Sequence, residues 1–576
     1  MPCGMAFPRL SRILTDHGIP TQGLRLIDRD IHLARALLVD GNAMMRSVTA
    51  AQLRDAGVGN VQTAGRVKEA RLMLERERFD IVLCTNEFSD GPDTGQDLLD
   101  ELRRENLLPH STVFLMMSEK ATYHQVVEAA ESALDGLLVR PYTAAVLCQR
   151  LLEARNRKRE LGDVLRALDA GQTEIAFAHA LKRFSDNLPY GSYCGRLAAE
   201  LLLTMQRPAD ARRIFEKLIQ TTSAPWAKLG VARAQMAAGD HTGARQSTQA
   251  LLASHPDFAD AHDLIGRILV EHCDFEGALR AYRAAASLTP GCLLRGQHAG
   301  ALAFYQGENT EALERLEHTL GLGVQSKLFD ALSLVLIALL RFDAGDVPGV
   351  LVMRKQLSQY RQRFPESVRL QRLELAAKLL VDLQQGAQEA AIADLSQLSL
   401  QVGSDDFDLE SANVLISLWS RVPDALVPAA EHEALVERIA MRFCTSKAIG
   451  EILVGSARRA ERDEAVIRRC QGQLSRLAEQ AMDRALRGDA GGAARDLLTH
   501  GEATLNAKLL DIAGQIARRY RETVGDADAL CERAAAVIQR SCRAGNVIAG
   551  IQRSGRSPGG LQVRGRSPTE AASAAA

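Results

Sequence analysis

Short apolar runs alternate with amphipathic segments over the first quarter of the chain, from residue 34 to about 158. Five runs have the length of a buried strand: ARALLV (34–39), VQTA (61–64), IVLC (81–84), TVFLMM (112–117) and GLLVR (136–140). The segments between and after them have the apolar spacing of helices, at 43–57, 67–77, 96–106, 123–133 and 144–158. Strands that alternate with helices favour a parallel sheet covered on both faces. The pattern therefore predicts a five-stranded α/β domain.

After about residue 160 the strand signal ends and a period of 34 residues begins. Three positions recur at this distance, since Gly239, Ala244 and Pro256 are followed by Cys273, Ala278 and Pro290. A period of this length predicts a stack of antiparallel helix pairs. Small residues let paired helices approach closely, and a large residue such as Phe215 or Tyr282 is expected to wedge into the neighbouring repeat.

The chain divides into five segments on this basis. Residues 1–33 have no periodic element and are expected to form a loose extension, and 34–158 form the α/β domain. The period is clear over 160–326, and it blurs over 327–545, with a break considered near 386–410. The tail, 546–576, contains GRSP twice and few apolar residues, so it is expected to be disordered.

Charge and composition exclude several classes of protein. Lys and Arg number 70 against 71 Asp and Glu, so no positive field draws the whole chain to nucleic acid or to anionic lipid. The most apolar run, 332–340, is about half the length that spans a bilayer. The ten cysteines form no CxxC pair, and the N-terminus has no signal-peptide layout. We expect a cytoplasmic protein.

Four motifs in 34–158 resemble the receiver domain of bacterial response regulators. They are LLVDGNAMMR, FDIVLCTNEF, FLMMS and LLVRPYTAAVL, at the first, third, fourth and fifth runs. The stretch at 259–290 is similar to the tetratricopeptide (TPR) consensus, and a receiver joined to such repeats resembles a known class of response regulators. The resemblance implies a flavodoxin-like receiver followed by an all-α TPR-like solenoid.

In the receiver family a partner histidine kinase phosphorylates an aspartate at the end of the third strand. An acidic pair holds Mg²⁺, and a hydroxyl and a lysine contact the phosphoryl oxygens. Mapped onto this chain, Asp40 matches the first acid, Gly41 stands in place of the second and Thr85 takes the acceptor position. Ser118 matches the hydroxyl, and Arg140 stands where the lysine belongs.

These replacements predict a degenerate pocket, a pseudo-receiver. A threonine hydroxyl carries no charge and is unreactive until a base removes its proton. With Gly41 and Thr85 two of three Mg²⁺-binding carboxylates are missing, so binding should be very weak and no cofactor is expected. Arg140 keeps the charge of a lysine and can pair with Asp40. A residual polar or metal role for Asp40 stays open beside that ion pair.

A second alignment of the third strand is also open. Counted back from Gly95 with a minimal loop, the acceptor position falls on Glu87 instead of Thr85. Glu87 would then be a built-in carboxylate that mimics an active state.

The TPR resemblance also implies a groove that binds a protein partner. The family's groove positions map to Trp226, Leu229, Arg233, Met236, Arg267, Phe304 and Tyr305, together with Asp260, Asp263, Glu271 and Gln297. This mixture of aromatic and charged residues suits a peptide groove, although each residue can instead belong to the core.

We therefore expect a signalling adaptor of a two-component phosphorelay. The receiver would dock to a histidine kinase or another two-component protein, or would dimerise, and the repeats would bind a protein. The alternative is a structural scaffold in which the receiver fold is an inert docking block. An enzyme is not expected, because the chain has no GxxxxGK[ST], HExxH or GxSxG motif.

Overall fold

The computed structural model describes most of the two predicted regions. Described are residues 28–88, 108–119, 135–221, 224–290, 292–324, 329–423 and 425–542, with residues 95, 98, 99 and 102. The helices expected at 96–106 and 123–133 lie outside the described residues except for residues 98, 99 and 102, and the tail at 546–576 lies wholly outside them.

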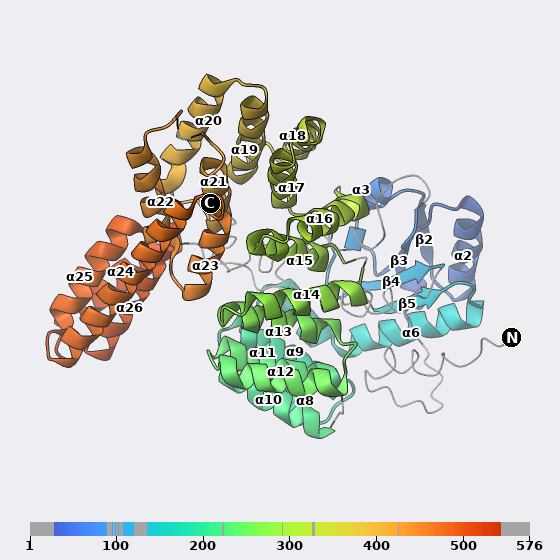
Figure 1. Cartoon of the computed structure of the whole chain (residues 1–576). Coiled ribbons are helices and arrows are strands. Elements are labelled where there is room, and N and C mark those ends of the chain that lie inside the picture. The colour runs from blue at the N-terminus through green and yellow to red at the C-terminus, as the bar shows by residue number, and fades with distance from the viewer. Residues whose placement is uncertain are drawn as a thin grey trace.

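The first region contains the expected parallel sheet, which confirms the predicted fold class. Its strands are β1 (Arg35–Val39), β2 (Asn60–Ala64), β3 (Ile81–Thr85), β4 (Val113–Ser118) and β5 (Gly136–Val139). All neighbours are parallel, in the order β2-β1-β3-β4-β5 (Figure 1). Parallel strands require long crossovers, and the two that the structure describes throughout contain the expected helices α2 (Ala43–Asp55) and α3 (Val67–Arg76).

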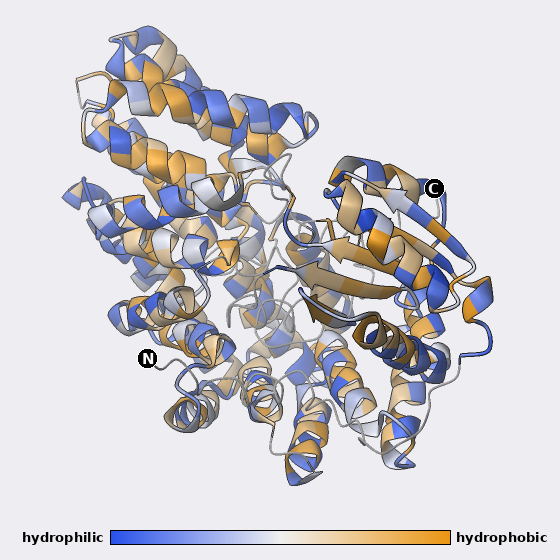
Figure 2. Cartoon of the chain, turned by 90° about the vertical axis from the view of Figure 1, so that its right-hand side faces the viewer, coloured by the Kyte–Doolittle hydropathy of each residue, from blue (hydrophilic) through white to orange (hydrophobic). Residues whose placement is uncertain are grey.

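Each face of the sheet forms its own core because side chains alternate along a strand. Leu38 and Leu83 pack with α2 (Ala43–Asp55) and α6 (Ala144–Glu160) on one face. On the other face, apolar strand residues pack with α3 (Val67–Arg76). The hydrophobic strands lie between helices with hydrophilic outer faces (Figure 2).

The remainder of the described chain is helical. Its first part comprises α7 (Gly162–Asp169), α8 (Thr173–Ser185), α9 (Gly191–Thr204), α10 (Pro208–Thr221), α11 (Pro225–Ala237), α12 (His241–Ser254), α13 (Ala259–Glu271), α14 (Phe275–Leu288), α15 (Leu293–Gln306) and α16 (Asn309–Gly323). Its second part comprises α17 (Leu332–Asp343), α18 (Val347–Gln362), α19 (Val368–Gln384), α20 (Gln388–Leu400), α21 (Leu409–Trp419), α22 (Ala429–Phe443), α23 (Lys447–Ser456), α24 (Glu461–Leu486), α25 (Ala490–Thr504), α26 (Ala507–Arg519) and α27 (Ala527–Ser541). Short 3-10 helices are η1 (Ile31–Leu33) and η2 (Gln401–Gly403).

An Asp-x-x-Gly turn starts the second helix of several pairs. Asp240, Asp274 and Asp489 each accept a hydrogen bond from the backbone N–H three residues later, at 2.9 to 3.0 Å. Such an N-cap satisfies a helix donor that otherwise has no partner. Asp489 lies far beyond the clear period, so this feature of the repeats extends into the degenerate part.

Close approach between neighbouring helices is made possible by glycine. A Cβ built on Gly230 of α11 would lie 2.4 Å from the ring of Phe215 in α10, and one on Gly266 of α13 would lie 3.0 Å from the ring of Tyr282 in α14. Gly195 and Gly300 meet large side chains of adjacent helices in the same way. Phe215 thus reaches α11 of the next repeat, as expected. Tyr282 fills the space beside Gly266 of its own repeat, and its ring centre lies 6.1 Å from that of His298 in the next one.

The array is not interrupted near 386–410. One continuous hydrophobic core extends from Ile265 to Ala534. In addition, α23 packs back against α13 and α15, where Arg458 Nη2 donates to the carbonyl of Tyr305 at 2.6 Å. The second half of the array therefore contacts the middle of the array through α23 (Figure 1).

Ion pairs fix α6, the last helix of the α/β domain, and His110 connects this domain to α7, the first helix of the array. Asp135, just before β5, contacts Arg157 of α6 at 2.6 Å. His110 Nδ1 lies 2.6 Å from Asp169 of α7. Asp28 contacts Arg155 of α6 at 2.5 Å, which attaches the first described residue before β1 to the domain.

We predict that Gly230→Ala lowers the free energy of unfolding by about 1–3 kcal/mol, because the added methyl group overlaps the ring of Phe215. Gly162→Ala is the matched control, since no atom lies within 4 Å of its added Cβ. It should be neutral, or stabilising by up to about 1 kcal/mol through helix propensity. Urea unfolding measures both, and equal effects would contradict the steric explanation.

The junction should respond to pH through Asp169. Burial disfavours its charged form, but hydrogen bonds from His110 outweigh burial and lower its pKa. A lowered pKa stabilises the fold above the ordinary value of about 3.9, and this stabilisation is lost as the pH falls through the folded-state pKa. Asp169→Asn should therefore cost roughly 0.5–1.5 kcal/mol at pH 7. In thermal melts, the difference from the unaltered protein should shrink below about pH 4.

Candidate functional site

Four of the predicted pocket residues stand at the carboxyl edge of the sheet, where ligands bind in parallel α/β folds. Asp40 directly follows β1, Thr85 and Ser118 end β3 and β4, and Arg140 follows β5. Val39 pairs with Cys84 in the sheet register, so Thr85 lies level with Asp40.

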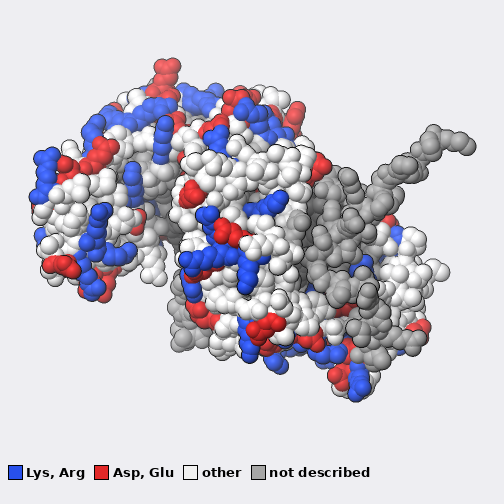
Figure 3. All heavy atoms as spheres, turned by 90° about the horizontal axis from the view of Figure 1, so that it is seen from below, with Lys and Arg blue, Asp and Glu red and all other residues white. Residues whose placement is uncertain are grey.

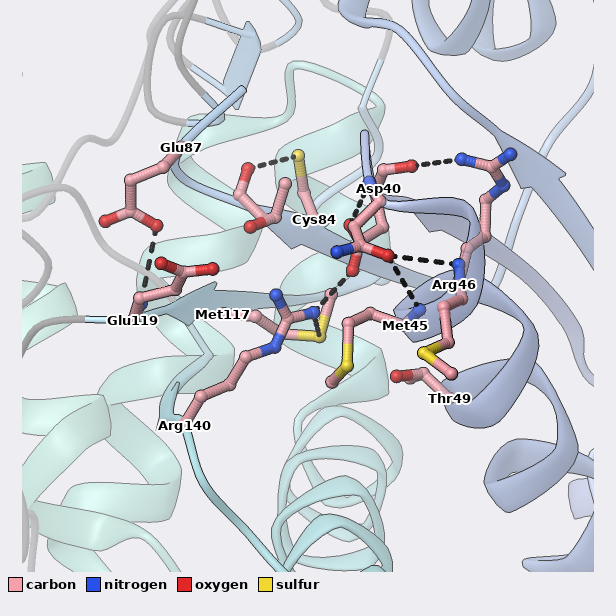
Figure 4. Close-up of polar contacts among 12 residues, drawn as sticks. Asp40, Met45, Arg46, Thr49, Cys84, Glu87, Met117, Glu119 and Arg140 are labelled. Atoms are coloured by element: carbon pink, nitrogen blue, oxygen red, sulfur yellow. Dashed lines mark hydrogen bonds and ion pairs between the residues drawn. The ribbon is translucent and has the colours of Figure 1, made fainter. Parts of the chain in front are cut away.

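Asp40 and Arg140 form a buried ion pair at this edge (Figure 4). Arg140 Nη2 donates to Asp40 Oδ2, and Asp40 Oδ1 accepts from the backbone N–H of Asn42 at 2.9 Å. The side chains are only 2% and 11% exposed. Burial disfavours the charge of Arg140, but the hydrogen bond and charge of Asp40 outweigh it and raise the pKa of the guanidinium. Such a pair is costly to break, because either partner alone would be a buried, uncompensated charge.

Thr85 is 2% exposed and lies between these charged groups and the core. Its neighbour Cys84 is fully buried, and burial together with the charge of Asp40 raises the pKa of the Cys84 thiol. The thiol is therefore neutral near pH 7, and the end of β3 carries no anionic side chain.

Glu87 provides a second, separate contact in the pocket. Ser118 Oγ donates to Glu87 Oε1 at 2.7 Å. The backbone N–H of Glu119 lies 3.4 Å from Glu87 Oε2 (Figure 4). Among the described residues of the segment after β3, Glu87 is the only carboxylate. It contacts Ser118, the residue that the resemblance matches to the family's hydroxyl.

The residues at this edge do not fit a divalent ion. Mg²⁺ is held by oxygen ligands, usually one or two carboxylates. Asp40 Oδ2 is engaged by Arg140, and Gly41 has no side chain to offer. Among the described residues, no three His, Cys, Asp or Glu side chains are grouped so that they could hold a metal.

Burial corrects part of the predicted partner groove. Leu229, Phe304 and Tyr305 are 0%, 7% and 4% exposed and belong to the hydrophobic cores between helices. Arg233 is 7% exposed. These four residues were assigned to the groove from repeat register alone, which does not specify how far neighbouring helices cover a position.

Several of the charged residues among the predicted groove positions form buried ion pairs between successive repeats. Arg233 of α11 forms two hydrogen bonds with Glu200 of α9, at 2.7 and 2.9 Å. Arg295 of α15 binds Asp260 and Asp263 of α13, each at 2.7 Å.

The pairing continues along the array. Gln297 donates to Ser333 at 3.2 Å, and Arg369 of α19 contacts both Asp330 and Glu410 of α21. Repeat register alone does not reveal these pairs, although opposite charges about one repeat apart, such as Glu200 and Arg233, are a signal in the sequence that could have found them.

Three groove candidates remain partly exposed: Trp226, Met236 and Arg267. The guanidinium of Arg196 lies 4.7 Å from the centre of the Trp226 ring. Glu271 is exposed as well. On the face of the molecule drawn in Figure 3, acidic and basic side chains are interspersed, and no field of one sign covers it.

Comparisons with known proteins agree with this division of the chain. The family model of the response regulator receiver domain matches residues 36–152, and a tetratricopeptide repeat model matches residues 196–268. Chemotaxis protein CheY-3 of Vibrio cholerae serotype O1 is 35% identical over 117 residues, which are 20% of this chain and 88% of that protein. The chain belongs to the response regulator receiver family.

Other relatives match this receiver as well. Chemotaxis protein CheY of Pseudomonas aeruginosa is 36% identical over 117 residues, 20% of this chain and 92% of that protein. The solved structure of the chemotaxis response regulator CheY4 of Vibrio cholerae is 25% identical, covers 21% of this chain and 98% of that chain, and has a TM-score of 0.20. No helix in the described part of this response regulator is both long and apolar enough to cross a membrane.

We predict a measurable coupling between Ser118 and Glu87. Ser118→Ala should lower the free energy of unfolding by about 1.5–3 kcal/mol, because it removes a hydrogen bond to a charged group. In a double-mutant cycle with Glu87→Ala, the coupling energy should be about 0.5–3 kcal/mol. Urea unfolding of the four proteins checks this, and strictly additive effects would show that the contact contributes nothing.

Proposed function

We propose that this response regulator is a two-component signalling adaptor whose receiver signals without phosphorylation and whose repeats bind a protein partner. The observation that carries the proposal is the buried Asp40–Arg140 pair beside Gly41 and Thr85. Receiver and TPR domains in general act through protein contacts, and the two are covalently joined here.

The loss of phosphorylation follows from the charges at the sheet edge. Phosphoryl transfer needs a cation to neutralise the oxygens of the transferred group and a nucleophile to attack it. Asp40 is held by Arg140, and the Thr85 hydroxyl is buried next to a neutral thiol. A hydroxyl in such surroundings has no strong base to activate it.

The contact of Glu87 with Ser118 supports the proposal that the receiver stays in one conformation without phosphorylation. The resemblance assigns to Ser118 the role of contacting a phosphoryl oxygen, and Glu87 Oε1 lies 2.7 Å from the Ser118 hydroxyl. A carboxylate oxygen is an anionic acceptor, as a phosphoryl oxygen is. In this proposal Thr85 occupies the acceptor position and Glu87, two residues further on, takes over the contact that phosphorylation would create.

The partners of the two parts are proposed separately. The receiver would dock to a histidine kinase or another two-component protein, or to a second copy. The array would bind its partner through Trp226, Met236 and Arg267, which are the partly exposed members of the predicted groove. Signalling would then depend on which partners are bound, not on an aspartyl phosphate.

Phosphorylation by acetyl phosphate with Mg²⁺ tests the proposal, with intact mass and hydroxylamine lability as readouts. The unaltered full chain should gain no hydroxylamine-labile phosphoryl group. The matched variant Gly41→Asp/Thr85→Asp/Arg140→Lys restores the three family residues and is expected to gain one. A labile adduct on the unaltered chain, at Glu87 or elsewhere in the receiver, would refute the claim that phosphorylation is lost.

A further inference from the structure

A cavity of about 590 Å³ lies in the second half of the array, far along the chain from the receiver pocket. It is formed where α17 and α21 end and where α22 and α24 begin. Its volume falls in the range of small-molecule sites, roughly 300–1,000 Å³. Phe342 and Trp419 give it an apolar wall, and Arg421, Arg459 and Arg462 give it a cationic one.

Two of these arginines share a single carboxylate. Arg421 is 5% exposed and donates from Nε and Nη2 to the two oxygens of Asp343, at 2.8 and 2.6 Å. Arg459 contacts the same Asp343. Asp343 therefore balances only one of these two charges. Glu461 also lines the cavity, and Asp463 Oδ1 lies 3.9 Å from Arg462 Nε.

The third arginine is oriented by a buried histidine. Arg462 Nη2 lies 2.8 Å from His432 Nδ1, and because an arginine can only donate, Nδ1 is the acceptor. Nε2 then carries the ring proton and donates to Asp463, which is fully buried, at 2.9 Å. The Trp419 ring packs on the imidazole with ring centres 4.8 Å apart.

The 26-residue helix α24 begins at the cavity with Glu461, and its N-cap, Ala460, has no side chain that can cap it. The partial positive charge of this helix end is offset by the acidic residues of its first turn, Glu461, Asp463 and Glu464, so the cationic side of the cavity comes from the arginines. Glu461 itself is exposed, so its charge is solvated at the rim of the cavity.

We propose that this cavity binds a small-molecule anion that joins a phosphate or carboxylate group to an aromatic or other apolar body. The acidic group would contact Arg459 and Arg462, and the apolar body would lie against Phe342 and Trp419. Through this site the helical array would respond to a small molecule. It does not depend on the state of the receiver, so it can fail or succeed independently of the proposed function.

The test uses the full chain with Trp226→Phe, which leaves Trp419 as the sole tryptophan of the two. Phenyl phosphate, benzoate and inorganic phosphate are titrated while Trp419 fluorescence and calorimetric heat are recorded. Saturable binding of phenyl phosphate or benzoate is expected, with a change in Trp419 emission. Tighter binding of phenyl phosphate would assign the acidic group as phosphate, and tighter binding of benzoate would assign it as carboxylate.

Arg459→Gln and Arg462→Gln should each weaken that binding about tenfold or more, because each removes a hydrogen bond to a charged group. Arg468→Gln is the matched control: this residue also belongs to α24 and is 48% exposed, but it contacts Glu451 and Glu464 outside the cavity. The affinity of this control variant for the anion should equal that of the unaltered chain. Melting curves without added anion test whether each variant is folded. If Arg462→Gln does not fold, the test rests on Arg459→Gln, because Arg459 is half-exposed.

Two results would overturn the proposal. One is the absence of saturable binding by all three anions. The other is binding that is equally strong in the unaltered chain, both cavity variants and the control, which would place the anion elsewhere on the surface.

Discussion

Close contact between helix backbones is the constraint on which the repeat half of this protein depends. At Gly195, Gly230, Gly266 and Gly300 a large side chain of the adjacent helix occupies the space that a Cβ would fill. Once helices are this close, polar side chains on the neighbouring faces are removed from water. Buried charges are stable only when they are paired with good geometry. The pairs Glu200–Arg233 and Arg295 with Asp260 and Asp263 meet this requirement from one repeat to the next.

These pairs give the array a register in addition to stability. Removing one partner leaves an unpaired buried charge, so a helix that slides by one residue against its neighbour pays the desolvation of an ion. Arg369 extends the same principle to the degenerate part, where it bridges Asp330 and Glu410 although the sequence period has faded. The continuous core from Ile265 to Ala534 is consistent with one stacked array.

The receiver also contains a buried ion pair, but here the pair occupies the carboxyl edge of the sheet. At the sheet edge the buried pair is Asp40 with Arg140, and the neighbouring residues Gly41 and Thr85 carry no charge. A metal ion would have to displace a guanidinium from a nearly inaccessible carboxylate. Glu87 is held apart from this pair by its bond to Ser118, which separates the pocket into two contacts that need no external ligand. The fold is therefore retained while its charge pattern differs from that of a phosphorylated receiver.

Local patterns in the sequence were sufficient for much of the architecture. Strand positions, the 34-residue period and the pocket substitutions depend on residue order alone, because period-2 and period-3.6 burial are properties of single elements. The same information did not separate core from surface among the groove candidates: Leu229, Arg233, Phe304 and Tyr305 are buried, whereas Trp226 is partly exposed. Exposure depends on how closely other helices approach, and so do the contact of Glu87 with Ser118 and the cavity between α17 and α24. The Glu87–Ser118 contact joins residues 31 positions apart, and the cavity brings together residues from Phe342 to Arg462, so only the packed structure could decide them.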